Sequence, residues 1–183
     1  MGTGLILAII GGVIVLWAIM TYNKMRVIGN RVDNAWSQVD VQLKRRYDLI
    51  PNLVETVKGY AAHEKETLEN VTKARSMGIE AKSVPEQAQA ENMLTQALRQ
   101  VFAVAEAYPQ LKANENFLAL QEELTSTESK IAFARQFYND TVLKFNNVIA
   151  VFPNVLLAGA FGFHKKDYFE IDEATRGPVK VQF

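Results

Sequence analysis

The feature that most constrains this chain is a long uncharged stretch at its N-terminal end. No charged side chain precedes Lys24, and residues 5–20 (LILAIIGGVIVLWAIM) are almost wholly apolar. About 20 helical residues, each rising about 1.5 Å, cross the roughly 30 Å hydrocarbon core of a bilayer. Trp17 and Tyr22 stand near one end, where amphipathic rings favour the lipid–water boundary. Residues 1–23 are therefore predicted to form a transmembrane anchor, with the lipid bilayer as a partner. The expected anchor side chains are Leu5, Ile6, Leu7, Ile9, Ile10, Val13, Ile14, Val15, Leu16, Trp17, Ile19 and Met20.

A cleaved signal peptide and the core helix of a soluble domain are the alternatives to a retained anchor. No lysine or arginine precedes the apolar run and no A-x-A-like site follows it, which argues against a signal peptide. A soluble core helix rarely lacks charge on every face. Basic residues follow the span at Lys24, Arg26 and Arg31, so the positive-inside rule predicts a single-pass protein with its remaining residues in the cytoplasm.

Beyond the anchor, apolar residues recur at alternating spacings of three and four. This period is typical of amphipathic helices that each bury one stripe, and no comparable run alternates with the period of a strand. The pattern predicts an all-α chain, in which the transmembrane helix continues into an up-and-down four-helix bundle over residues 24–153. The expected stripes are Val32, Trp36, Val39, Leu43, Tyr47 and Ile50; Val54, Val57, Ala61, Glu64, Leu68 and Val71; Leu94, Leu98, Val101, Ala105 and Tyr108; and Phe117, Leu120, Leu124, Thr127, Ile131, Ala134, Tyr138, Val142, Phe145 and Phe152.

Residues that cap or break helices divide these stripes. Asp48 and Pro51 permit two interpretations: a new helix capped by Asp48, or a kink within one long helix. A loop is expected from Gly78 to Pro85, in which Ser83–Glu86 (SVPE) matches a capping box. After a break at Pro109, Asn114 is placed to cap the fourth helix, which Pro153 ends.

The C-terminal part differs from the bundle. Residues 154–171 are rich in glycine and aromatics, and we expect a capping segment made of a short helix and an extended strip over one end of the bundle; residues 172–183 are expected to form a tail. Its aromatic side chains either cover one end of a monomer or form an oligomer or partner surface. These side chains are Phe161, Phe163, Tyr168 and Phe169.

Residue patterns that carry chemistry are sparse. His63 and Glu64 begin like a zinc-protease motif, but Thr67 occupies the place of the second histidine. The absence of cysteine removes thiolate metal ligands and thiol nucleophiles. Twenty basic and twenty acidic residues balance, which argues against a nucleic-acid binder. We predict no enzymatic activity, catalytic residue, metal or cofactor.

Two charged features within the helices need an explanation. The basic cluster of Lys44, Arg45 and Arg46 is expected to form a solvated face or to pair with acidic residues of the next helix. Glu64 falls on an apolar stripe, so it is expected either near the end of the bundle or beside a base such as Lys130 or Arg135, because an unpaired buried carboxylate is strongly disfavoured as an ion.

Three segments of the chain resemble the LemA family of bacterial membrane proteins. They are residues 34–60 (NAWSQVDVQLKRRYDLIPNLVETVKGY), 64–75 (EKETLENVTKAR) and 152–169 (FPNVLLAGAFGFHKKDYF). The resemblance implies a bromodomain-like four-helix fold on a single anchor in the bacterial inner membrane, and it brings no established activity or cofactor. Some members of the family are encoded near HtpX-type membrane metalloproteases, and one branch takes part in building magnetosome membranes.

Three functional hypotheses follow from the residues and the resemblance. The first is a non-catalytic membrane scaffold that self-associates through its helical domain as a homo-oligomer. The second, suggested by the resemblance alone, is a regulator or substrate adaptor of an HtpX-type membrane metalloprotease. The third is an enzyme, which would need a buried polar cluster that the residue spacing does not show.

Overall fold

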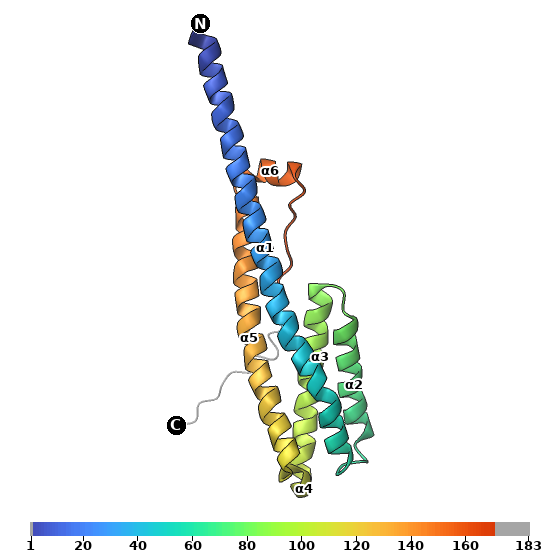
Figure 1. The fold of residues 1–183 in the computed structure, drawn as a ribbon. Coiled ribbons are helices and arrows are strands. Elements are labelled where there is room, and N and C mark those ends of the chain that lie inside the picture. Colours follow the sequence, from blue (N-terminus) through green and yellow to red (C-terminus); the bar gives the residue numbers. More distant parts are fainter. Residues whose placement is uncertain (1, 171–183) are drawn as a thin grey trace, which may run out of the picture.

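The computed structural model describes residues 2–170, and every regular element in that range is a helix (Figure 1). The predicted all-α class is therefore confirmed, whereas the expected tail lies outside the described residues. The helices are α1 (Gly2–Lys58), α2 (Lys65–Glu80), α3 (Val84–Ala107), α4 (Pro109–Lys112), α5 (Glu115–Ala150) and α6 (Asn154–Ala160).

Helix α1 runs without a break from the apolar span into the bundle, as predicted. Pro51 lies inside it, so the interpretation in which Asp48 caps a new helix is wrong. Proline cannot donate to the carbonyl four residues earlier, which here belongs to Tyr47. Arg75 of α2 replaces the missing donor, because its Nε donates to that carbonyl oxygen at 2.8 Å. A contact from a neighbouring helix therefore stabilises the proline-containing turn.

The first chain reversal of the bundle lies between α1 and α2, at residues 59–64. The sequence pattern predicted one helical stripe from Val54 to Val71, which is wrong because the chain turns within it. Ala61 is buried in the turn itself, and Leu68 is buried in α2. The apolar spacing thus continues across the turn, which is why periodicity alone did not reveal the break.

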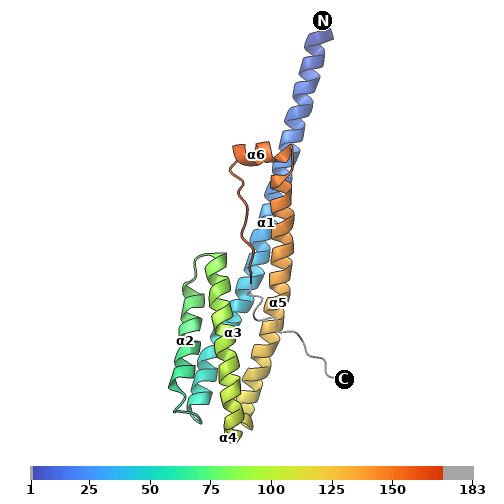
Figure 2. The same ribbon diagram turned by 180° about the vertical axis from the view of Figure 1, so that it is seen from behind.

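The architecture is a long antiparallel pair, α1 with α5, on which a shorter hairpin of α2 and α3 packs (Figures 1 and 2). The hairpin covers only the half of the pair farther from the N-terminus. Most of the predicted stripe residues are buried between these helices. Phe152 is the clear error: it is 79% exposed, because α5 ends at Ala150.

Two predicted caps are present. The Ser83 hydroxyl accepts a hydrogen bond from the Glu86 backbone N–H at 3.4 Å, and the Asn114 side chain accepts one from the Phe117 N–H at 3.0 Å. Gly78, expected in the loop, instead lies within α2 and is buried. A Cβ atom there would lie 2.3 Å from the Tyr47 Oη, so the absent side chain permits close packing of α2 on α1.

After α5 the chain bends by 97° into α6. Residues 163–170, which we call the return strip, then run back as extended chain beside α1 and α5 towards the start of α3 (Figure 2). The short helix and the extended strip agree with the sequence expectation. Their placement differs, because the strip lies lengthwise along the long pair instead of over one end of the bundle.

Candidate functional site

The predicted anchor residues lie on the part of α1 that projects beyond the bundle (Figure 1). Their side chains point to every face of the helix. Each large aliphatic side chain from Leu5 to Met20 is more than half exposed, between 51% at Ile10 and 72% at Met20. A helix that is apolar all round needs apolar surroundings. By length and composition α1 can cross a membrane, and α5 with α6 passes the same test only as a bent pair.

The aromatic residues predicted as an oligomer or partner surface do not share one exposed face. Phe169 is only 1% exposed, and its ring lies 5.7 Å from that of Trp36. Phe163 and Tyr168 are half-buried against the core, whereas Phe161 is 56% exposed. Three of the four therefore pack within the chain and attach the return strip to the long helices.

Two asparagines of α5 hold the backbone of the return strip. Asn139 donates to the Phe169 carbonyl at 3.1 Å and accepts from the Phe169 N–H at 2.9 Å. Asn146 makes the same pair of bonds with Lys166, both at 2.9 Å. Seven helical residues rise about 10.5 Å and three extended residues about 10 Å, so the two asparagines match the strip's repeat. This role was not predicted from the sequence, in which the spacing of seven residues between Asn139 and Asn146 is the one signal for it.

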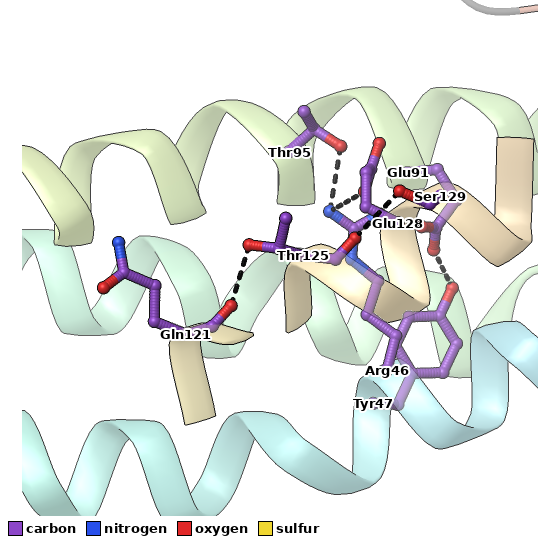
Figure 3. A network of polar contacts seen from close by, with 8 residues as sticks. All are labelled: Arg46, Tyr47, Glu91, Thr95, Gln121, Thr125, Glu128 and Ser129. Atoms are coloured by element: carbon purple, nitrogen blue, oxygen red, sulfur yellow. Dashed lines mark hydrogen bonds and ion pairs between the residues drawn. The ribbon is translucent and has the colours of Figure 1, made fainter. Parts of the chain in front are cut away.

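A buried polar network joins α1, α3 and α5 (Figure 3). The Arg46 side chain is 4% exposed, and it forms ion pairs with Glu91 of α3 at 2.9 Å and Glu128 of α5 at 2.8 Å. Arg46 also donates to the Thr95 hydroxyl at 3.0 Å. The expectation that the cluster pairs with the next helix is thus wrong in its choice of helix, because its acidic partners belong to α3 and α5. Lys44 and Arg45 are both exposed, in agreement with the expected solvated face, and Arg45 also pairs with Glu123 of α5 at the surface.

The network has a second layer beside Glu91. The Tyr47 hydroxyl donates to the Glu91 carboxylate and accepts from the Gln87 amide, the latter at 2.6 Å. Burial raises the pKa of Glu91, and the Arg46 guanidinium opposes that rise. Burial and the Glu91 charge also raise the pKa of Tyr47. These groups pair mainly with one another, and the Arg46 Nε is buried without a hydrogen-bond partner among the described residues. The arrangement holds three helices in register.

The remaining titratable candidates are placed at the periphery. Glu64 is half-buried at the end of the bundle, where it accepts from the Tyr108 hydroxyl at 3.1 Å. This position agrees with the first of the two alternatives for Glu64. His63 and His164 are exposed. Within residues 2–170 no group of three histidine, cysteine, aspartate or glutamate side chains could hold a metal ion.

An apolar groove lies between α1 and α5. It is open, has a volume of about 620 Å³, and has three exposed apolar side chains: Val41 (62%), Phe133 (73%) and Phe137 (53%). Lys130 lines it, as does Gln42, whose Oε1 is buried without a hydrogen-bond partner among residues 2–170. Phe133 and Phe137 lie off the predicted stripe of this helix, so the apolar period does not indicate this surface.

Comparisons with known proteins agree with this architecture. Magnetosome protein MamQ 2 of Paramagnetospirillum magneticum is 25% identical over 187 residues, covering 88% of this chain and 69% of the relative. Protein LemA of Metamycoplasma hominis is 27% identical over 154 residues, covering 82% and 69%. Neither name describes an enzymatic activity, and with the exposed span of α1 they indicate a membrane-associated protein. Residues 35–183 match the model of the LemA family, to which the chain therefore belongs.

Proposed function

We propose that this protein is a non-catalytic membrane scaffold whose copies associate side by side through the groove between α1 and α5. The observation that carries the proposal is the exposure of Phe133 and Phe137, next to Val41, on the outer face of an otherwise well-packed pair. Aromatic rings bury large areas and dominate the energetics of interfaces. An exposed cluster of them is therefore a candidate contact surface.

The anchor favours a second copy as the occupant of the groove. Val41 lies 19 residues beyond Tyr22 on the same unbroken helix, about 28 Å along its axis. Every copy in one membrane therefore carries its groove at the same height. Confinement to the bilayer raises the effective concentration of matching surfaces, and two grooves can meet about a twofold axis along the membrane normal.

Polar groups at the groove suit such a contact. Gln38 and Lys130 are exposed at the groove and carry hydrogen-bond donors. In a symmetric pair, these donors can bond to acceptors on the second copy. The scaffold thus gains polar contacts that fix its register in addition to the apolar one.

The placement of the bundle is part of this proposal. Lys24, Arg26 and Arg31 follow the span, so α1 is proposed to be the single crossing, with the bundle on the cytoplasmic side of a bacterial inner membrane. A fluorescent reporter that matures only in a reducing cytoplasm, fused after Phe183, checks this orientation. A dark fusion together with an active periplasmic reporter at the same site would reverse it.

The mass of the protein extracted in mild detergent tests self-association. We expect the wild type to be a dimer or larger, and the double variant Phe133→Ser, Phe137→Ser to be a monomer with unchanged helix content. Ile79→Ser is the matched control, because Ile79 is 54% exposed on α2, away from the groove. A monomeric wild type, or a double variant that keeps the full mass, contradicts the proposal.

The alternative of a protease adaptor enters the same experiment as an outcome. It rests on the family resemblance, and no contact within the described residues favours it. Co-purification of a membrane metalloprotease at near-equal yield with a monomeric chain would replace the self-associating scaffold with that adaptor. The absence of a protease from a dimeric preparation would count against the adaptor.

A further inference from the structure

The end of α5, the bend and α6 form an uncharged stretch that the bundle buries only in part. No charged residue occurs between Lys144 and His164. A second uncharged stretch of this length would ordinarily belong to a core or a membrane. Here, five large apolar side chains are exposed within eleven residues: Val151 (51%), Phe152 (79%), Val155 (44%), Leu156 (64%) and Phe161 (56%). We call residues 151–161 the foot.

The foot is oriented across the long axis of the molecule. Helix α6 is bent by 97° from α5, and α5 runs antiparallel to α1, so α6 projects sideways from the rod (Figures 1 and 2). If α1 crosses a bilayer close to its normal, α6 lies nearly parallel to the membrane plane. This is the orientation of an interfacial helix, which buries one apolar face among the lipid headgroups and upper acyl chains.

The height of the foot on α1 coincides with the expected edge of the hydrocarbon. The Phe161 ring packs edge-on against Tyr22, with centroids 5.0 Å apart. From Gly2 to Tyr22, α1 contains 21 residues and rises about 31 Å, close to the thickness of a hydrocarbon core of about 30 Å. The foot therefore stands where the acyl chains give way to headgroups.

The charges around the foot agree with this level. The Arg26 guanidinium lies 5.7 Å from the Phe163 ring centroid, and its Nε donates to the Tyr22 hydroxyl at 3.2 Å. Lys24 and Lys165 are also exposed nearby in sequence. Basic side chains next to an apolar surface are typical of segments that contact phosphate headgroups from the aqueous side.

We propose that the foot is a second membrane-binding element. Its apolar face inserts into the lipid–water interface of the leaflet from which α1 emerges. It is not a second span, because Phe145 and Ile149 of α5 are buried immediately before it, so α5 remains packed on the bundle. A single helix leaves a rod free to tilt and rotate. Two contacts with the bilayer set both angles, whether or not copies pair through the groove.

The absence of cysteine makes a direct depth measurement available. The full chain, carrying one introduced cysteine with a nitroxide label, is reconstituted in vesicles of phosphatidylcholine and phosphatidylglycerol. Collisions with oxygen, which enters lipid, are compared with collisions with a water-soluble nickel chelate present on both sides. The labelled positions are Leu156→Cys in the foot, Ile10→Cys in the span and Ile79→Cys as the aqueous control. Ile79 shares a surface hollow with Lys44, 22 residues and about 33 Å beyond Tyr22 along α1.

We expect the ratio of oxygen to nickel collisions at Leu156 to exceed that at Ile79 severalfold and to lie below that at Ile10, which is deeper in the bilayer. Phe152→Cys, at the most exposed of the five large apolar side chains, should give the same result as Leu156→Cys. A ratio at Leu156 equal to that at Ile79 would place the foot in water and overturn the proposal. Low collision rates with both reagents would also overturn it, because they would place the foot against protein.

Discussion

The long α1–α5 pair is completed differently in its two halves. Far from the span, the α2–α3 hairpin packs on it through side chains, with Arg46 and Glu91 enclosed in the interface. Nearer the span, the single extended return strip replaces the hairpin. A helix satisfies its own backbone, whereas an extended chain does not. This is why α5 supplies Asn139 and Asn146 as paired donors and acceptors only where the strip lies.

The two halves consequently depend on different interactions. In the distal half, removal of one member of the buried charge network leaves the others desolvated and unpaired. In the proximal half, aromatic packing of Phe169 and Tyr138 against Trp36 combines with neutral hydrogen bonds to the backbone. Loss of one charged group should therefore destabilise the whole distal half. Loss of one hydrogen bond in the proximal half should detach the return strip while the helices stay folded.

The largest effect is expected in the distal half, from Arg46→Ala. This change leaves the buried Glu91 carboxylate without its cation and should lower the free energy of unfolding by about 3–5 kcal/mol. Arg45→Ala is the matched control, because Arg45 is half exposed and pairs with Glu123 at the surface, where such pairs contribute about 1 kcal/mol or less. Denaturant unfolding of the detergent-solubilised chain measures both, and equal losses would contradict the assigned burial.

A smaller and local effect is expected in the proximal half, from Asn139→Ala. The change leaves the Phe169 N–H and carbonyl without their partners, which should weaken docking of the return strip by about 1–3 kcal/mol. Hydrogen exchange should accelerate in residues 163–170 and stay unchanged in α2 and α3. Asn147→Ala, at an exposed asparagine of the same helix, is the control. Faster exchange throughout the bundle would show that the two halves are not independent.

The smallest expected effect is a loss of stability at high pH, when Tyr138 ionises; at neutral pH no loss is expected. Burial, together with the Asp167 and Asp33 carboxylates, raises its pKa from 10.0 to about 12, and its hydroxyl donates to the Asp167 carbonyl at 2.9 Å. A raised folded-state pKa means that this contribution to stability is complete below about pH 10 and is lost as the pH rises towards 12. Tyrosinate absorbance should contain a component near pH 12 that disappears in Tyr138→Phe. An identical titration curve in the variant would refute the assignment.

Local features of the sequence predicted local features of the fold. The apolar period located most of the core, and the caps at Ser83 and Asn114 formed because a cap involves residues three positions apart. The exceptions are informative. The three-and-four spacing of apolar residues continues across the turn at residues 59–64, so it does not mark the turn. Pro51 lies within a helix in which Arg75, 28 residues from Tyr47, donates to the Tyr47 carbonyl. No window of neighbouring residues contains that information.

The sequence by itself therefore determined the helical class and the apolar span of this LemA-family protein, since both depend on the order of side chains along one helix. The tertiary structure decided which residues meet. It enclosed Arg46 but left Lys44 exposed, buried Phe169 while exposing Phe133, and set α6 across the rod. Burial depends on which helix faces cover one another. Residues of the same chemical type therefore acquire different roles only when distant segments pack together.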